Sequence, residues 1–311
     1  MKTLCCIWLA AAVAVMPALA DEACQPSRWG ADDEIGNANL ITAASVLEAA
    51  QLIKTGKVYS LGITIGADTP AFPPRGLSIT VVQPNQQESA RPFGAMTYND
   101  DIFTGWLGIG PQLDGLGHLG DDGEYYNCNK ARDFSLITGL TKLGIEKVPP
   151  IVARGIVLDM AGYFEADFLE AGRHFSVEDV KAVAERQGTP VQEGDVVLFH
   201  TGWTEAKLQS DPQAWAAGGP GISEEVATYL AASNVVAAGA DTWGLDVVPS
   251  QHPDRPFQGH ITLLKENGIY ILETMNTGPL VRDGAFEFLF VLGQAKVRGA
   301  VQMIINPVAI R

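Results

Sequence analysis

Short apolar runs separated by turn residues occupy most of the second half of the chain. Runs of four to seven mostly apolar residues are typical of strands that are buried on both faces. The predicted strands are 155–158, 196–199, 235–238, 269–272, 286–292 and 300–305. Further strands are expected at 58–63 and 77–82, on either side of a Gly- and Pro-rich loop.

Helical spacing of apolar residues marks three other segments. Each follows a residue whose hydroxyl can cap a helix, and the expected helices are 43–54 after Thr42, 176–186 from Ser176 and 224–232 after Ser223. Helices between strands that are buried on both faces are typical of a mixed α/β fold.

Four of the apolar runs end directly in a polar residue: Asp159, His200, Asp241 and Glu273. In α/β proteins the carboxyl ends of buried strands meet at one rim, where ligands bind. Any single one of these residues could instead cap a loop or a helix. Their recurrence favours a site to which several of them contribute.

The first 20 residues resemble a secretory signal peptide rather than part of the fold. Lys2 provides a positive start, an uncharged apolar run follows, and Ala18-Leu19-Ala20 is a small-x-small cleavage signal. The apolar run is shorter than the ~20 residues that a membrane-spanning helix needs. We therefore expect an exported protein, periplasmic or secreted, whose mature chain is a single domain over residues 21–311.

Composition limits the possible partners. The chain is 47% hydrophobic and 18% charged, as globular proteins are, and its formal net charge is −15. Such a charge repels nucleic acid and anionic lipid, so we expect neither nucleic acid nor, for the mature form, a membrane as a partner. Cys24 and Cys128 remain after cleavage, and export allows a disulfide between them without requiring one.

Two pairs of residues carry candidate chemistry. Asp114 and His118 lie four residues apart in a Gly-rich turn, and His260 and Glu273 flank an apolar stretch in which a short helix, 261–265, precedes a strand. Carboxylates and imidazoles together provide ligands for a divalent cation and a group that moves protons. A Glu after four apolar residues is costly to bury unless a cation neutralises it.

With these pairs in place, the chain resembles the metal-dependent cyclase/hydrolase family that includes bacterial kynurenine formamidase and isatin hydrolase. The family motif His-x-Gly-Thr-His-x-Asp-x-Pro-x-His aligns with residues 108–118, so that Asp114 matches a metal ligand and His118 matches the proton-transfer residue. The second signature matches His260, Leu263-Leu264 and Glu273. Segments 29–37 and 200–203 and the turn at Asp241 also look similar, so the resemblance covers nearly the whole mature chain.

The chain departs from the family motif at two ligand positions. Gly108 and Gln112 stand where the motif has its first two histidines. The resemblance therefore implies one ion, Zn²⁺ or Mn²⁺, held by Asp114, His260 and Glu273, with Gln112 as a marginal ligand and water completing the shell. His252 is an alternative ligand that we place in the substrate pocket or on the surface, and His174 is expected to be structural.

The resemblance also implies a barrel-like β core with helices outside, a homodimer or homotetramer, and hydrolysis of a small amide, with His118 as general base and acid. We expect an arylformamidase-like enzyme, of the kind that serves tryptophan breakdown. The alternatives are a lactone, ester or cyclic-imide hydrolase of the same fold, or a periplasmic protein that binds without turnover. The candidate substrate-pocket residues are Trp106, His200, Trp203, Asp241, Trp243 and His252.

Overall fold

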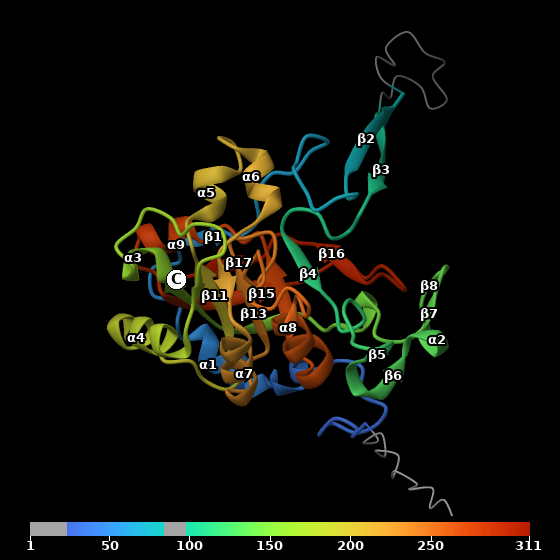
Figure 1. Ribbon diagram of the computed structural model, residues 1–311, viewed down its shortest axis with the longest axis horizontal. Coiled ribbons are helices and arrows are strands. Elements are labelled where there is room, and N and C mark those ends of the chain that lie inside the picture. The colour runs from blue at the N-terminus through green and yellow to red at the C-terminus, as the bar shows by residue number, and fades with distance from the viewer. Residues whose placement is uncertain (1–23, 84–97) are drawn as a thin grey trace, which may run out of the picture.

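The computed structural model describes residues 24–83 and 98–311, so the expected signal peptide lies outside the described residues. The fold is built around one curled sheet of nine strands that forms half a barrel, with helices around it (Figure 1). The strand order is β1-β17-β15-β9-β11-β13-β14-β4-β16. The expected mixed α/β fold with a barrel-like core is confirmed.

The centre of the sheet is parallel and fully covered. Strands β9 (Ile151–Asp159), β11 (Val196–His200), β13 (Ala237–Ala240) and β14 (Tyr270–Glu273) run in the same direction. Every residue of β11, β13 and β14 is buried, as their uninterrupted apolar runs predict. The carboxyl ends of these strands therefore share one edge of the sheet.

Antiparallel strands extend the sheet on both sides. Strand β4 (Gln112–Asp114) pairs with β14, and β16 (Gln302–Ile304) pairs with β4. On the other side lie β15 (Glu287–Leu292), β17 (Val308–Ile310) and β1 (Val58–Ser60). The chain thus brings its N-terminal half, through β4, between two strands from its last quarter.

Helices cover the sheet and begin where the sequence indicates. Helix α1 (Ala43–Ala50) starts after a capping box between Thr42 and Ser45, but it ends before the expected residue 54. Helices α4 (Val177–Gln187) and α7 (Glu224–Ala232) follow Ser176 and Ser223, whose hydroxyls accept backbone N–H groups. In the described part of the chain, no helix is both long and apolar enough to cross a bilayer.

The remaining elements are short. The helical segments are η1 (Gly36–Leu40), η3 (Tyr126–Cys128), α2 (Ala131–Phe134), η4 (Ile145–Lys147), α3 (Met160–Tyr163), α5 (Trp203–Lys207), α6 (Pro212–Ala217), α8 (Gln258–His260), η5 (Ile261–Glu266) and α9 (Gly278–Arg282). The small strands pair as β5 (Glu124–Tyr125) with β6 (Asn129–Lys130), β7 (Ser135–Leu136) with β8 (Gly139–Leu140), and β10 (His174–Phe175) with β12 (Gly221–Ile222).

Two further features lie outside the central sheet. Strands β2 (Leu77–Val82) and β3 (Asp100–Gly105) form an antiparallel ribbon that projects from the body (Figure 1). Cys24 and Cys128 form a disulfide, which fastens the N-terminal arm to the segment that follows β4. The bridge that the sequence allowed is therefore present.

Candidate metal centre

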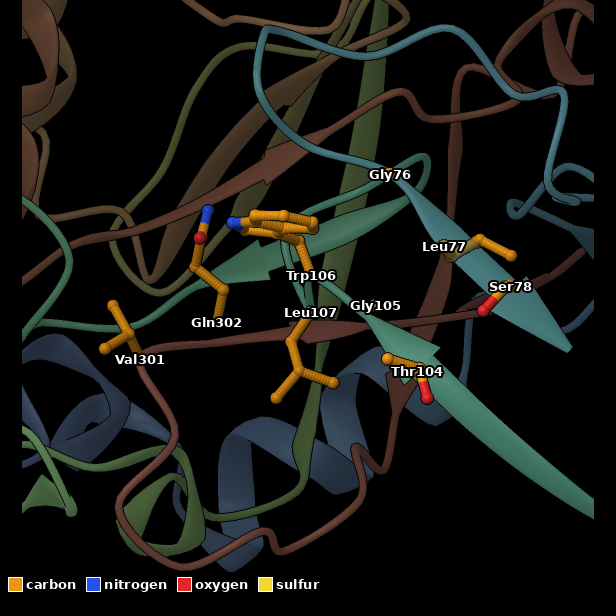
Figure 2. A pocket seen from close by; sticks show the side chains of 9 residues that line it. All are labelled: Gly76, Leu77, Ser78, Thr104, Gly105, Trp106, Leu107, Val301 and Gln302. Carbon is orange, nitrogen blue, oxygen red and sulfur yellow. The ribbon is translucent and has the colours of Figure 1, made fainter.

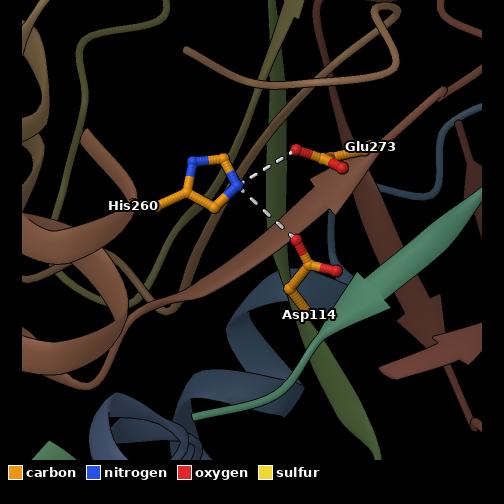
Figure 3. A group of neighbouring side chains, drawn as sticks. All are labelled: Asp114, His260 and Glu273. Carbon is orange, nitrogen blue, oxygen red and sulfur yellow. Dashed lines mark ion pairs between the residues drawn. The ribbon is translucent and has the colours of Figure 1, made fainter. Parts of the chain in front are cut away.

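Three buried side chains from distant parts of the sequence meet at one end of the sheet: Asp114, His260 and Glu273 (Figure 3). The Nε2 atom of His260 lies 3.2 Å from Glu273 Oε1 and 3.7 Å from Asp114 Oδ2. One candidate ligand atom from each residue lies within 4.8 Å of the other two. A nitrogen and two carboxylate oxygens at this spacing can surround a divalent ion after small side-chain adjustments.

Strand register explains why the carboxylates converge. Asp114 ends β4 and Glu273 ends β14, and the antiparallel pairing places Gln112 opposite Glu273 and Ile271 opposite Asp114. Residues two apart on a strand point to the same face, so both carboxylates project from one face of the sheet. The two acidic groups are therefore held close together by the ladder itself.

His260 comes from the helical segment that precedes β14. The expected helix starts after His260, but α8 begins at Gln258 and continues directly into the π-helical turn η5. Phe257, just before α8, has a left-handed backbone with φ of 60°. The left-handed residue re-aims the chain, and π-helical turns are frequent at functional sites. His260 therefore lies at the end of a helical turn, with Nε2 of its ring next to the two carboxylates.

Asp246 orients the imidazole of His260. Its carboxylate accepts hydrogen bonds from the backbone N–H groups of Gly259 and His260, and it also contacts Nδ1 of the His260 ring. A carboxylate next to Nδ1 keeps the proton on that nitrogen and leaves the Nε2 lone pair free. Nε2 is the atom that faces Asp114 and Glu273.

The electrostatics of the cluster favour a bound cation. Burial and the charge of Asp114 raise the pKa of Glu273 to about 7. Burial alone would lower the pKa of His260, but the surrounding carboxylates raise it well above its usual value. Asp114 Oδ2 is buried and accepts no hydrogen bond from residues 24–83 and 98–311. An orphaned carboxylate oxygen between an imidazole and a second carboxylate fits a divalent ion.

His118 stands beside this cluster at the surface of a cavity. Its Nε2 atom lies 3.9 Å from Asp114 Oδ2, and its side chain is 19% exposed. Burial lowers the pKa of His118, and the positive charges of His260 and Arg75 act in the same direction against the attraction of Asp114. A neutral imidazole at this position can accept a proton.

The cavity next to the three ligands has a volume of about 210 Å³ and largely aromatic walls. Phe72 and Trp243 stack on one side, with their ring centroids 5.4 Å apart. The residues that line the cavity are Phe72, Arg75, His118, Leu119, Trp243, Gly244, Phe257, His260 and Glu273. Trp243 is the predicted pocket residue that the structure brings to this cavity.

Two other predicted pocket residues lie in separate hollows. Trp106 lines a groove of about 790 Å³ at the base of the β2–β3 ribbon, together with Leu77, Leu107 and Gln302 (Figure 2). His252 lines a third hollow that also contains His174. Neither Trp106 nor His252 is among the described residues that line the cavity at the metal ligands.

The other three predicted pocket residues, His200, Trp203 and Asp241, are buried. Asp241 accepts hydrogen bonds from the backbone N–H groups of Thr201 and Gly202. His200 Nδ1 lies 2.8 Å from Thr277 Oγ1, and Trp203 is only 2% exposed. Asp241 thus holds the turn after β11, and none of these three residues is among the described residues that line the cavity.

Sequence reasoning did not find several residues of the site. Arg75 and Phe257 line the cavity, Asp246 orients His260, and Gln302 donates a hydrogen bond to Asp114. Gln302 and Asp246 each interrupt an apolar stretch, and this interruption is the sequence feature that could have indicated a buried polar role for them. Their partners could not be identified because the contacts depend on strand register and on chain folding.

Gln112 lies between the two carboxylates, but with its donor group toward them. Its Nε2 atom donates to Glu273 Oε2 at 2.6 Å and to Asp114 Oδ1 at 3.3 Å. Between two carboxylates the amide NH₂ group is the complementary end of the side chain. Its role as a marginal ligand stays a prediction, since an N–H group cannot bind a cation without the amide turning over.

Comparisons with known proteins agree with the fold. A solved structure described as a novel cyclase is 29% identical, with a TM-score of 0.83, over 91% of this chain and 98% of its own. An isatin hydrolase bound to the product analogue thioisatinate is 20% identical, with a TM-score of 0.62, over 86% and 98%. Isatin hydrolase A from Ralstonia solanacearum is 18% identical, with a TM-score of 0.61, over 86% and 97%.

The curated proteins contain no significant match to this chain. The family model named Cyclase matches residues 59–247, which is more than half of the chain. The match includes Asp114 and His118 and ends before His260. In the fold, His260 lies next to Asp114. The chain belongs to the Cyclase family.

Proposed function

We propose that this protein is a metal-dependent hydrolase of a small amide, with arylformamidase-like activity. The observation that carries the proposal is the buried Asp114 Oδ2, which has no hydrogen-bond partner among the described residues and lies near His260, Glu273 and His118. A ligand set and a proton-transfer group thus meet at the wall of one cavity. The carboxylate-rich set is compatible with Zn²⁺ and with Mn²⁺.

The residues divide the chemistry between them. A divalent cation in such a site acidifies water and polarises a carbonyl group. Asp114, His260 and Glu273 would hold it, while Asp246 fixes the His260 tautomer. His118 accepts a proton from the attacking water and later donates it to the leaving nitrogen. The lowered pKa of His118 keeps this imidazole neutral, and therefore ready to act as a base, near pH 7.

The cavity favours a small, flat, aromatic substrate. Phe72, Trp243 and Phe257 provide apolar faces, and a volume of about 210 Å³ suits a single substituted ring. Arg75 adds a positively charged guanidinium group to the cavity wall, and its Nη1 atom donates a hydrogen bond to Gly108 O. A guanidinium group at the cavity wall is suited to a carbonyl or carboxylate of the substrate.

A second candidate is a cyclic-imide or lactone hydrolase. Isatin hydrolases with 18–20% identity share the fold, and opening a cyclic amide would use the same ligands and the same proton transfer. A protein that binds without turnover is the third candidate. We further propose a mature, exported homodimer or homotetramer, and the Cys24–Cys128 disulfide supports export because such bridges persist in oxidising compartments.

The test is a hydrolysis screen of formyl-anilides, cyclic imides and aryl lactones, with and without Mn²⁺ or Zn²⁺. We expect metal-dependent turnover of a formyl-anilide, a loss of bound metal in Glu273→Ala, and a ~10²–10⁴-fold lower turnover with retained metal in His118→Ala. Preference for a cyclic substrate would select the second candidate. Metal binding without turnover of any substrate would select the binding protein.

A further inference from the structure

Two glutamines, Gln302 and Gln112, donate hydrogen bonds to the carboxylates of Asp114 and Glu273. Gln302 Nε2 donates to Asp114 Oδ1 at 2.6 Å, and Gln112 Nε2 donates to Glu273 Oε2 at 2.6 Å. Gln112 also reaches Asp114 Oδ1 at 3.3 Å. Both amides are buried. Each carboxylate thus has one oxygen tied to an amide and the other turned toward His260.

The sheet register builds this arrangement. Gln302 on β16 lies directly opposite Asp114 on β4, and Gln112 on β4 lies directly opposite Glu273 on β14. Directly opposed residues have their Cβ atoms about 5 Å apart on the same face, so each amide meets its carboxylate without distortion. The two glutamines and the two acids therefore form two cross-strand pairs, two residues apart along β4, on one face of three neighbouring strands.

Gln302 occupies space that a side chain at position 108 would need. A Cβ atom added to Gly108 would lie 2.4 Å from Gln302 Oε1 and 2.6 Å from its Nε2. Gly108 and Gln112 are the two positions where the family motif has histidine ligands. The terminal amide of Gln302 therefore fills the place of one such imidazole, and Gln112 itself replaces the other.

Charge and hydrogen bonding both disfavour a second cation here. A further ion on this side would have to bind Asp114 Oδ1 and Glu273 Oε2, the oxygens that already accept amide N–H groups. Two carboxylates balance one divalent charge, whereas a second ion would leave two positive charges uncompensated in a buried site. Neutral amide donors provide hydrogen bonds without adding ligands or negative charge.

We propose that Gln302 and Gln112 form an amide clamp that restricts this centre to one cation, bound through Asp114 Oδ2, Glu273 Oε1 and His260 Nε2. The clamp holds each carboxylate in a one-oxygen orientation toward the ion. Gln302 is thereby a positioning residue of the metal centre. The inference rests on the proposed metal site but not on the identity of the substrate or on turnover.

The test counts ions and measures affinity with Mn²⁺ alone, by metal analysis after equilibrium dialysis and by titration calorimetry. The wild-type protein is expected to bind one ion per chain. Gln302→Leu should still bind one ion, with a Kd about 10–100-fold higher because Asp114 loses its orienting donor. The combined variant G108H/Q112H/Q302A restores the two imidazoles in the space that the clamp vacates, and it should bind two ions.

Gln187→Leu is the matched control, since Gln187 also bonds through both ends of its amide, to Val157 O and Asp159 N, outside the centre. It should keep one ion and an unchanged Kd. Two ions on the wild type, an unchanged Kd in Gln302→Leu, or one ion on a folded triple variant would each overturn the clamp. If the triple variant does not fold, the affinity of Gln302→Leu decides. Failure of the proposed function appears differently, as a correctly loaded protein without hydrolysis.

Discussion

Asp246→Asn should weaken metal binding through the tautomer of His260, although Asp246 touches no candidate ligand atom directly. The carboxylate contacts Nδ1 of His260 and accepts the N–H groups of Gly259 and His260. Asparagine has the same shape but offers an NH₂ group in place of one oxygen. If that NH₂ group faces Nδ1, the ring proton moves to Nε2, the atom that must bind the ion.

The size of the effect follows from this change. Loss of an orienting partner of a metal-bound imidazole costs about 10–100-fold in affinity, or roughly 1.4–2.7 kcal/mol. Calorimetric titration with Mn²⁺ or Zn²⁺ measures the Kd, and nitrogen NMR of labelled histidine reports which ring nitrogen carries the proton. Asp159→Asn is the control, because Asp159 caps α3 through Gly162 and contacts none of the three ligands.

Wild-type affinity of Asp246→Asn for the cation would refute this role of Asp246. A lower affinity with the proton still on Nδ1 of His260 would refute it too, since the loss would then have another cause. A general loss of structure would appear in the circular dichroism spectrum and in thermal unfolding. The hydrogen bonds that Asp246 accepts are worth about 1.5–3 kcal/mol each when the acceptor is charged, so some destabilisation is expected.

Three further predictions concern pH dependence and stability. Because the pKa of His118 is lowered in the fold, kcat/KM should fall only at a pH below the usual titration range of histidine, and His118→Ala should lack this acid limb. Arg154→Met leaves the buried Asp195 unpaired and should cost about 3–5 kcal/mol in urea unfolding at pH 7. Burial raises the pKa of Asp195 to about 6 although Arg154 lowers it, so without Arg154 this carboxyl takes up a proton at a higher pH. The cost should therefore shrink as the pH falls toward about 6 and grow as the pH rises. Cys24→Ser removes the disulfide to Cys128, which links residues 104 positions apart, and should lower the free energy of unfolding by up to about 4–5 kcal/mol. Reductant should lower the Tm of the wild type and leave the Tm of the variant unchanged.

The sequence predicts the central strands because they are buried on both faces. Uninterrupted apolar runs place β11 and β14 within one residue of their observed bounds. The run 235–240 is equally apolar throughout, so the start of β13 could not be fixed, and the strand lies at Ala237–Ala240. Strand β3 was not predicted, because all of its residues are exposed and it is a strand only through its pairing with β2.

The metal ligands were accessible from sequence for a different reason. Asp114, His260 and Glu273 belong to two local signatures, each readable within a short stretch of chain. Gln302 carries no such signature, since it meets Asp114 only because β16 pairs with β4 across 188 positions of sequence. Residues that support a site from neighbouring strands are therefore the part that a single sequence does not reveal.

Four acids at or next to strand ends show how a carboxylate of a metal site differs from one that serves the fold. Asp159 accepts the N–H of Gly162, and Asp241 accepts the N–H groups of Thr201 and Gly202, so the turns that follow β9 and β11 satisfy both acids. Asp114 Oδ2 has no such donor in the described chain, and Glu273 Oε1 has only the N–H of Leu245. A position at a strand end is therefore not enough to identify a metal ligand. The acids whose turn provides no hydrogen-bond donors are the ones that need a cation.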